Sequence, residues 1–200
     1  MLAPVYDRLW ARYVGVSVRR TIDLIRLRGG ERVLDVGCGT GVLLGALARM
    51  RPGLNLVGLD ASPEMLARAR VRVGPNPALD QGSAAELPYD DGAFDLVTST
   101  SVLHSIPGEL EPILGEWRRV LAPGGVLVIT DWRAGHLGTR AYNAGLALVG
   151  RRQRPLAVTK LVATLDSVGL ETTALEKFQI DGWGLVSVRA EEESRLDTQA

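Results

Sequence analysis

Three glycines alternate with other residues just after a short apolar run, an arrangement typical of a ligand-binding loop. Residues 32–36 are apolar enough for a buried strand, and Gly37, Gly39 and Gly41 follow at once. Glycine lets a ligand approach the backbone closely and permits positive φ angles. A glycine loop between a strand and a helix also points free backbone N–H groups at whatever binds there. Because a tight turn needs the same glycines, the loop alone is weak evidence for a nucleotide site.

Two acidic residues make the loop more informative. Asp35 lies two positions before the first glycine, where it could accept a hydrogen bond from an ammonium group or brace the loop. Asp60 ends the apolar run of residues 54–59. An acid at the end of a second parallel strand is placed to accept hydrogen bonds from both hydroxyls of a ribose. Together the two acids favour a ligand with a ribose and a positive charge.

The glycine spacing separates two classes of nucleotide ligand. The dinucleotide fingerprint G-x-G-x-x-G needs a third glycine at position 42, where this chain has Val42. A loop that binds pyrophosphate also has no evident use for the acid at Asp35. The residues therefore favour an adenosine that carries an amino acid over NAD.

Few other side chains are candidates for chemistry. His104 follows the apolar run of residues 94–98, on the side where a substrate should bind, and could act as a general base; a structural or positioning role explains it equally well. Cys38 has nothing cationic nearby in the sequence, so it is interpreted as a small loop residue. Trp132 would line an acceptor pocket or fill the core.

Composition limits the class of protein. The chain has 200 residues, of which 23 are basic and 23 acidic. Nucleic-acid binders usually carry a basic excess, so a nucleic acid is disfavoured as a partner. One cysteine and two histidines supply too few ligands for a usual zinc site, and no metal is expected. Neither a signal-peptide pattern nor an apolar run of the ~20 residues that a membrane helix needs is found, which predicts a cytoplasmic protein.

Apolar strand-like runs alternate with segments of helical period, which predicts an α/β fold with a mainly parallel sheet. One domain should cover residues 1–190, with a helical cap at 1–30, a substrate lid at 133–158 and a frayed tail at 191–200. Within the lid, Arg151, Arg152 and Arg154 could meet an anionic substrate or form a solvated surface. The predicted strands are 32–36, 54–59, 78–82, 94–98, 126–131, 170–178 and 184–190, and the predicted helices are 40–50, 62–73, 110–121, 139–149 and 159–168.

Five ordered segments resemble class I methyltransferases, and most of all the UbiE-like group of small-molecule enzymes. The resemblance spans residues 30–132 in register, and the combination of motifs is highly specific. The segments are VLDVGCGTG (33–41), GLDASPEML (58–66), AAELPY (84–89), FDLV (94–97) and RVLAPGG (119–125).

This resemblance implies a Rossmann-like three-layer sandwich. Its mainly parallel seven-stranded sheet would include an antiparallel strand from a C-terminal hairpin. It also implies S-adenosyl-L-methionine as cofactor and methyl transfer to a small, hydrophobic or aromatic molecule. Nucleic-acid amino-methylation is disfavoured because residues 98–101 read Thr-Ser-Thr-Ser instead of an Asn/Asp-Pro-Pro-aromatic segment.

The resemblance also assigns cofactor-binding residues. Gly37, Gly39 and Thr40 would lie near the methionine part, and Asp35 would support the loop. Ser99 and Thr100 would lie near the methionine tail or the methyl group. Asp60 would bind the ribose. Ala61, Met65, Ser83 and Ala84 would contact the adenine. Tyr6 and Tyr13 would close over the cofactor or serve only in helix packing. Family members often have Asp where this chain has Ser83.

An alternative function is a regulatory protein that binds S-adenosylmethionine on the same fold without transferring its methyl group. This alternative stays open because no catalytic base is identifiable beyond the candidate His104. A third reading, an NAD-dependent oxidoreductase, is disfavoured by the missing glycine at position 42.

Overall fold

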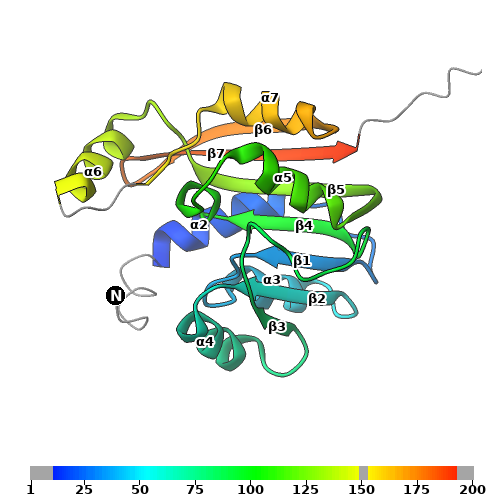
Figure 1. Ribbon diagram of the computed structural model, residues 1–200. Coiled ribbons are helices and arrows are strands. Elements are labelled where there is room, and N and C mark those ends of the chain that lie inside the picture. Colours follow the sequence, from blue (N-terminus) through cyan, green and yellow to red (C-terminus); the bar gives the residue numbers. More distant parts are fainter. Residues whose placement is uncertain (1–10, 149–152, 193–200) are drawn as a thin grey trace, which may run out of the picture.

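The computed structural model describes residues 11–148 and 153–192, which form a seven-stranded sheet with helices on both faces (Figure 1). The strand order is β3-β2-β1-β4-β5-β7-β6. All neighbouring pairs from β3 to β5 are parallel, whereas β7 is antiparallel to both β5 and β6. The strands are β1 Arg32–Val36, β2 Asn55–Asp60, β3 Ala78–Gln81, β4 Phe94–Thr100, β5 Leu121–Trp132, β6 Leu170–Ile180 and β7 Trp183–Glu192. The predicted fold class is confirmed.

Two layers of helices bury the two faces of the sheet, and side chains of β1 alternate between them. Leu34 packs in a core with α5 and α7, whereas Val33 packs in a second core with α2 and α3. The helices are α2 Ala11–Asp23, α3 Val42–Met50, α4 Pro63–Val73, α5 Leu110–Arg119, α6 Leu137–Leu148 and α7 Val158–Ser167, with a short 3₁₀ helix η1 at Leu103–Ser105. A strand buried on both faces is expected to be continuously apolar, as residues 33–36 of β1 are except for Asp35. Arg32, at the start of the strand, is exposed.

Local signals account for several element ends. The Ser62 hydroxyl accepts a hydrogen bond from the backbone N–H of Met65 at 3.2 Å, and Pro63 occupies the first helical position of α4. Both features are favourable at a helix start because the first N–H groups have no partner within the helix. The predicted start of this helix is confirmed.

β5 begins earlier than predicted. The sequence places a turn at residues 122–125 and starts the strand at 126, but the strand begins at Leu121, which pairs with Phe94. The pairing then shifts register, so that Leu96 pairs with Val126. The Pro-Gly-Gly residues therefore form an irregular part of the strand, because pairing with β4 overrides their local turn preference.

The domain limits predicted from the sequence are not tested by the structure. Within the predicted cap, α2 covers residues 11–23, and within the predicted lid, α6 packs against β7. Residues 1–10, 149–152 and 193–200 lie outside the described residues. Of the predicted frayed tail, Glu191 and Glu192 belong to β7. Across the described chain, we find no helix with the length and apolar character needed to span a bilayer.

The strand order reverses between β1 and β4, and this reversal determines where a ligand can bind. The chain moves from β1 to β2 and β3 on one side, then returns to β4 on the other. The loops that follow β1 and β4 consequently diverge and leave a crevice at the carboxyl ends of the strands. The glycine loop lies at this crevice.

Leu34→Ala should lower the free energy of unfolding by about 2–5 kcal/mol, because Leu34 is fully buried at the centre of the sheet. Urea denaturation measures the change. As a control, Val71→Ala on α4 removes a side chain that is 89% exposed and should change the free energy by less than about 0.5 kcal/mol. Equal effects of the two substitutions would contradict the assigned core.

Candidate active site

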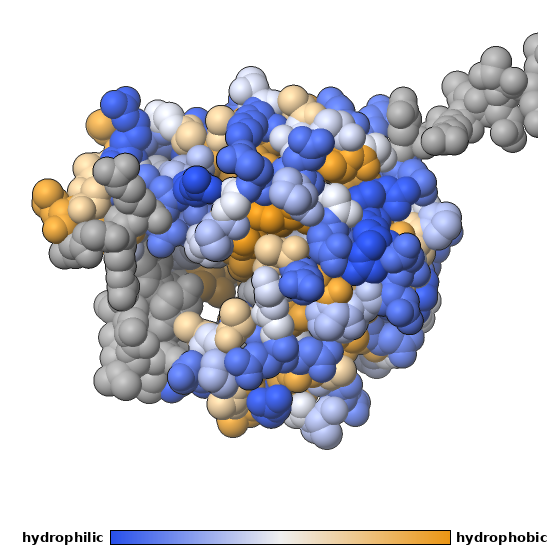
Figure 2. Space-filling view, in the orientation of Figure 1, coloured by the Kyte–Doolittle hydropathy of each residue, from blue (hydrophilic) through white to orange (hydrophobic). Residues whose placement is uncertain are grey.

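A pocket of about 770 Å³ opens at the carboxyl ends of β1, β2 and β4. Figure 2 shows the surface hollowed here, with apolar residues visible inside. Most of the cofactor-binding residues predicted from the sequence line this pocket, namely Asp35, Gly37, Gly39, Thr40, Asp60, Ala61, Met65, Ser83 and Ala84. Ser99 and His104 do not line it, and Tyr6 lies outside the described residues.

The glycine loop is tied to the end of β2. Leu59 O accepts hydrogen bonds from the N–H groups of Gly37 and Cys38, at 2.7 and 3.0 Å. One carboxylate oxygen of Asp60 accepts from Gly39 N–H at 2.8 Å, and the other accepts from Ser62 N–H at 2.9 Å. Each carboxylate oxygen can accept a further hydrogen bond. Asp60 can therefore position the loop and also bind the hydroxyls of a ribose.

Gly37 and Gly39 are required by different constraints. A Cβ on Gly37, where φ is 71°, would lie 2.3 Å from a methyl carbon of Val102, so no larger residue fits without a shift. A Cβ on Gly39, where φ is 53°, would meet no atom within 4 Å. At Gly39 the backbone thus lines open pocket space, which is the close approach that a ligand needs.

Asp35 is buried beneath the loop, where its carboxylate accepts a hydrogen bond from the Thr98 hydroxyl at 3.0 Å. Burial raises the pKa of Asp35 to about 7, while the hydrogen bond from Thr98 lowers the pKa and the charge of Asp60 raises it. A buried carboxylate of this kind is stabilised in its ionised form by a cation. The group is therefore suited to a positively charged ligand.

Cys38 has the properties of a loop residue. Its thiol is buried against the sheet, and burial together with the charges of Asp35 and Asp60 raises the pKa of the thiol. A thiol with a raised pKa is a poor nucleophile at neutral pH. These properties agree with the sequence-based interpretation of Cys38.

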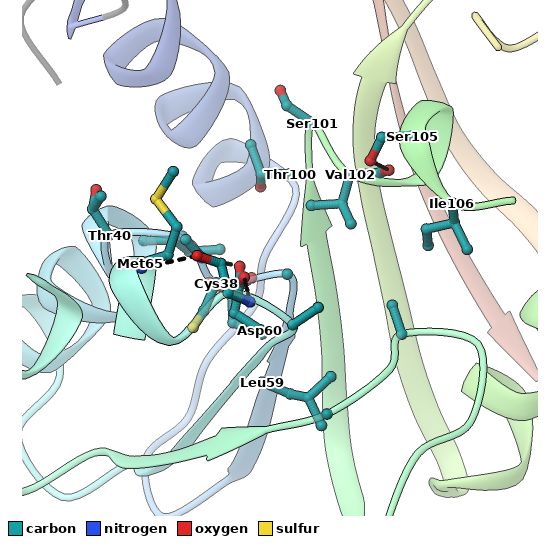
Figure 3. Close-up of a pocket in the computed structure, with 18 of the residues that line it drawn as sticks. Cys38, Thr40, Leu59, Asp60, Met65, Thr100, Ser101, Val102, Ser105 and Ile106 are labelled. Atoms are coloured by element: carbon teal, nitrogen blue, oxygen red, sulfur yellow. Dashed lines mark hydrogen bonds between the residues drawn. The ribbon is translucent and has the colours of Figure 1, made fainter. Parts of the chain in front are cut away.

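The opposite wall of the pocket comes from α2 and the chain that follows β4. Figure 3 shows Thr100, Ser101 and Val102 leading into Ser105 and Ile106, across from Asp60 and Met65. Because side chains alternate along a strand, Ser99 points to the face opposite Thr100, and its hydroxyl is buried with no hydrogen-bond partner in the described structure. Thr100 and Ser101 line the pocket at this position instead.

His104 lies just behind this wall, in η1. Its Nδ1 is 2.6 Å from a carboxylate oxygen of Asp131, and its ring stacks on Trp132 with 4.3 Å between centroids. Of its two neighbours in the sequence, Ser105 lines the pocket and Leu103 does not. The His104 side chain is 7% exposed.

Asp131 was missed by the sequence reasoning, although an acid at the end of a predicted strand is a recognisable signal. Besides the His104 ring, its carboxylate accepts hydrogen bonds from the backbone N–H groups of Val102 and His104, at 3.0 and 3.3 Å. Asp131 is fully buried. It fixes the chain between β4 and η1.

Aromatic side chains lie beside the same wall. The Trp132 Nε1 group donates a hydrogen bond to the Tyr13 hydroxyl, and Trp183 stacks on Trp132 with 5.1 Å between centroids. Trp132, predicted to line an acceptor pocket or to fill the core, belongs to this cluster. Of the predicted arginine cluster, Arg154 donates to Gly108 O, while Arg151 and Arg152 lie outside the described residues.

Comparisons with known proteins identify the class. Residues 34–129 match the family described as a methyltransferase domain. The chain is 40% identical over 139 residues to a demethylmenaquinone methyltransferase of Thermus thermophilus, covering 66% of this chain and 62% of the relative. It is 33% identical over 132 residues to a ubiquinone/menaquinone biosynthesis C-methyltransferase of Geobacter sp., covering 63% of this chain and 53% of the relative. The chain thus spans little more than half the length of these relatives.

A solved structure supports the fold. The S-adenosylmethionine-dependent methyltransferase of Mesorhizobium loti aligns with a TM-score of 0.74 over 87% of this chain and 96% of that chain, at 20% identity. Residues 34–129 thus match the methyltransferase-domain family, and the fold of the described chain is that of a class I methyltransferase. The family implies S-adenosylmethionine as the cofactor, and the open backbone at Gly39 and the free acceptor positions of Asp60 fit that molecule.

The affinity for S-adenosylmethionine should rise about tenfold between pH 6 and pH 8, because Asp35, with a pKa of about 7, ionises over this range and attracts the cationic cofactor. Stability without cofactor should change in the opposite sense. The folded-state pKa of Asp35 lies above that of the unfolded chain, so the contribution of Asp35 to the free energy of unfolding is fully present below about pH 4 and is lost as the pH rises through about 7.

Calorimetry and urea denaturation at several pH values measure the two effects. Asp35→Asn should flatten both pH dependences, whereas Asp166→Asn, on α7 away from the pocket, should preserve them. A wild-type affinity that does not change between pH 6 and pH 8 would contradict the role of Asp35.

Proposed function

We propose that the protein transfers a methyl group from S-adenosylmethionine to a small, hydrophobic or aromatic molecule. One observation carries the proposal. A single pocket has Asp35, the glycine loop and Asp60 on one side, and a wall of apolar and hydroxyl side chains on the other. A cofactor on the first side would have its reactive end directed at an acceptor on the second.

The residues divide the work between binding and alignment. When bound, S-adenosylmethionine supplies an electrophilic methyl group on a sulfonium. Asp60 would accept hydrogen bonds from the ribose, and ionised Asp35 would favour the cationic cofactor over its neutral product. Val14 and Val18 on α2 and Ile106 after η1 would exclude water and align the acceptor. Alignment is a major contribution to a displacement of this kind.

The acceptor class is supported by the chemistry of the wall. Val14, Val18, Val102, Ile106 and Pro107 form an apolar surface that suits a hydrophobic ring. The relative from Thermus thermophilus is named for demethylmenaquinone, and this wall suits a lipophilic aromatic acceptor of that general kind. The zero formal net charge supports a small molecule over a nucleic acid. The cytoplasmic location stays a prediction from the sequence.

Asp60→Ala should weaken binding of S-adenosylmethionine more than tenfold, because the ribose contacts and the link to Gly39 N–H are both lost. Calorimetry measures affinity, and transfer of labelled methyl groups to a panel of small aromatic molecules measures activity. Asp90→Ala, an exposed loop acid outside the pocket, is the control. A folded protein that binds neither S-adenosylmethionine nor its demethylated product would overturn the proposed function. Binding without transfer to any acceptor would favour the regulatory alternative.

His104 is our candidate for the general base, and because its ring does not line the pocket, it would reach the acceptor through one bridging water. The carboxylate of Asp131 at Nδ1 would favour the tautomer with its proton on Nδ1 and leave Nε2 free to accept a proton. His104→Gln should then lower kcat about 100-fold. The affinity for S-adenosylhomocysteine should stay within about threefold, because the ring does not line the pocket. A kcat within about fivefold of wild type would instead assign His104 a structural role.

A further inference from the structure

Ser101, at the end of β4, has a backbone conformation that few residues of its type adopt. Its φ is 62°, and within the described chain the only other non-glycine residue with positive φ is Asp181, in the turn between β6 and β7. Such conformations cost free energy for a side chain with a Cβ and occur where surrounding contacts enforce them, often at functional sites. Ser101 is not in a hairpin turn, so its conformation calls for another explanation.

Contacts on both sides of Ser101 enforce this conformation. Its own N–H donates to Thr130 O at 2.7 Å, and the next N–H, of Val102, donates to the carboxylate of Asp131 at 3.0 Å. Both partners belong to β5, so the chain at Ser101 is attached to the neighbouring strand before and after the strained residue. The effect is to place the Ser101 side chain on the pocket wall next to Thr100 (Figure 3).

The Ser101 hydroxyl is also oriented by a short chain of hydrogen bonds. Its Oγ is 2.8 Å from the Tyr13 hydroxyl, which accepts a hydrogen bond from Trp132 Nε1. An indole N–H can only donate, so the Tyr13 hydroxyl keeps its proton for an oxygen atom, and Ser101 Oγ and Ser17 are its side-chain partners. When Tyr13 donates to Ser101 Oγ, the Ser101 proton is left to donate into the pocket. Burial raises the pKa of Tyr13, so its hydroxyl keeps its proton at neutral pH.

We propose that Ser101 binds the methyl acceptor by donating a hydrogen bond to an oxygen atom of that molecule. The acceptor is then an aromatic or hydrophobic molecule with a hydroxyl or carbonyl oxygen close to the atom that receives the methyl group. The apolar side chains of Val102 and Ile106 contact its carbon skeleton, and the Ser101 hydroxyl donates a hydrogen bond to its oxygen atom. This inference rests on the proposed function, because it takes the cofactor to occupy the side of the pocket formed by Asp60 and the glycine loop.

The test uses the full chain saturated with S-adenosylhomocysteine and a pair of probes that differ in one hydroxyl, 2-naphthol and naphthalene. Wild-type protein should bind 2-naphthol about tenfold more tightly than naphthalene, as expected for one hydrogen bond in a pocket. Fluorescence titration measures both affinities. Ser101→Ala and Ser101→Gly should each reduce the preference to less than about threefold.

The two variants separate the hydroxyl from the backbone strain. Both remove the hydroxyl, but only glycine tolerates φ of 62° without strain, so Ser101→Gly should be the more stable of the two. Equal loss of the 2-naphthol preference in both variants would assign the effect to the hydroxyl. Tyr13→Phe should reduce the preference as well, because Ser101 loses the partner that orients its proton. Ser167→Ala, at the end of α7, is the remote control and should leave the preference unchanged.

Three results would overturn the proposal while leaving the proposed function intact. The wild-type protein could bind S-adenosylhomocysteine but neither probe, it could bind both probes equally, or Ser101→Ala could keep the preference for 2-naphthol. Failure to bind S-adenosylhomocysteine would instead contradict the proposed function itself.

Discussion

The carboxylate of Asp60 is the interaction on which the cofactor side of the site depends. Its two oxygens accept backbone N–H groups from two different segments, the glycine loop at Gly39 and the start of α4 at Ser62. The parallel register of β1 and β2, with Val36 opposite Leu59, brings these segments together at one edge of the sheet. A charge-assisted hydrogen bond is roughly twice as strong as a neutral one, so one side chain can fix both segments relative to each other.

The opposite wall follows the same principle with a different carboxylate. Asp131 accepts N–H groups from Val102 and His104 and so fixes the path of the chain after β4. The two halves of the site also meet directly, because the Val102 side chain occupies the space that a Cβ on Gly37 would need. A shift of Val102 would therefore move the glycine loop, and this loop and the opposite wall of the pocket form one packed unit.

Signals that lie close together in the sequence predicted the elements and the cofactor side of the site. Ser62 and Pro63 define the start of α4, and the acids in or after two apolar runs, Asp35 and Asp60, identify the pocket. Features that depend on contacts between distant residues were not predictable in the same way. The sequence of residues 122–125 is typical of a turn, but pairing with β4 makes these residues part of β5. The strained φ of Ser101 arises from two hydrogen bonds to β5. Whether Ser99 or Thr100 faces the pocket likewise depends on the orientation of β4 in the sheet.

The place of β7 between β5 and β6 has a consequence for how the sheet is assembled. β7 follows β6 in the chain but is the strand that pairs with β5, so the free edge of β5 stays uncovered until the hairpin of β6 and β7 has formed. Thr130 and Asp131, which fix the acceptor wall, lie on that same strand. During synthesis, an emerging chain that ends before Trp183 would expose the unpaired edge of β5, and unpaired strand edges promote self-association. The β6–β7 hairpin therefore both covers the edge of β5 and supports the strand that carries Thr130 and Asp131.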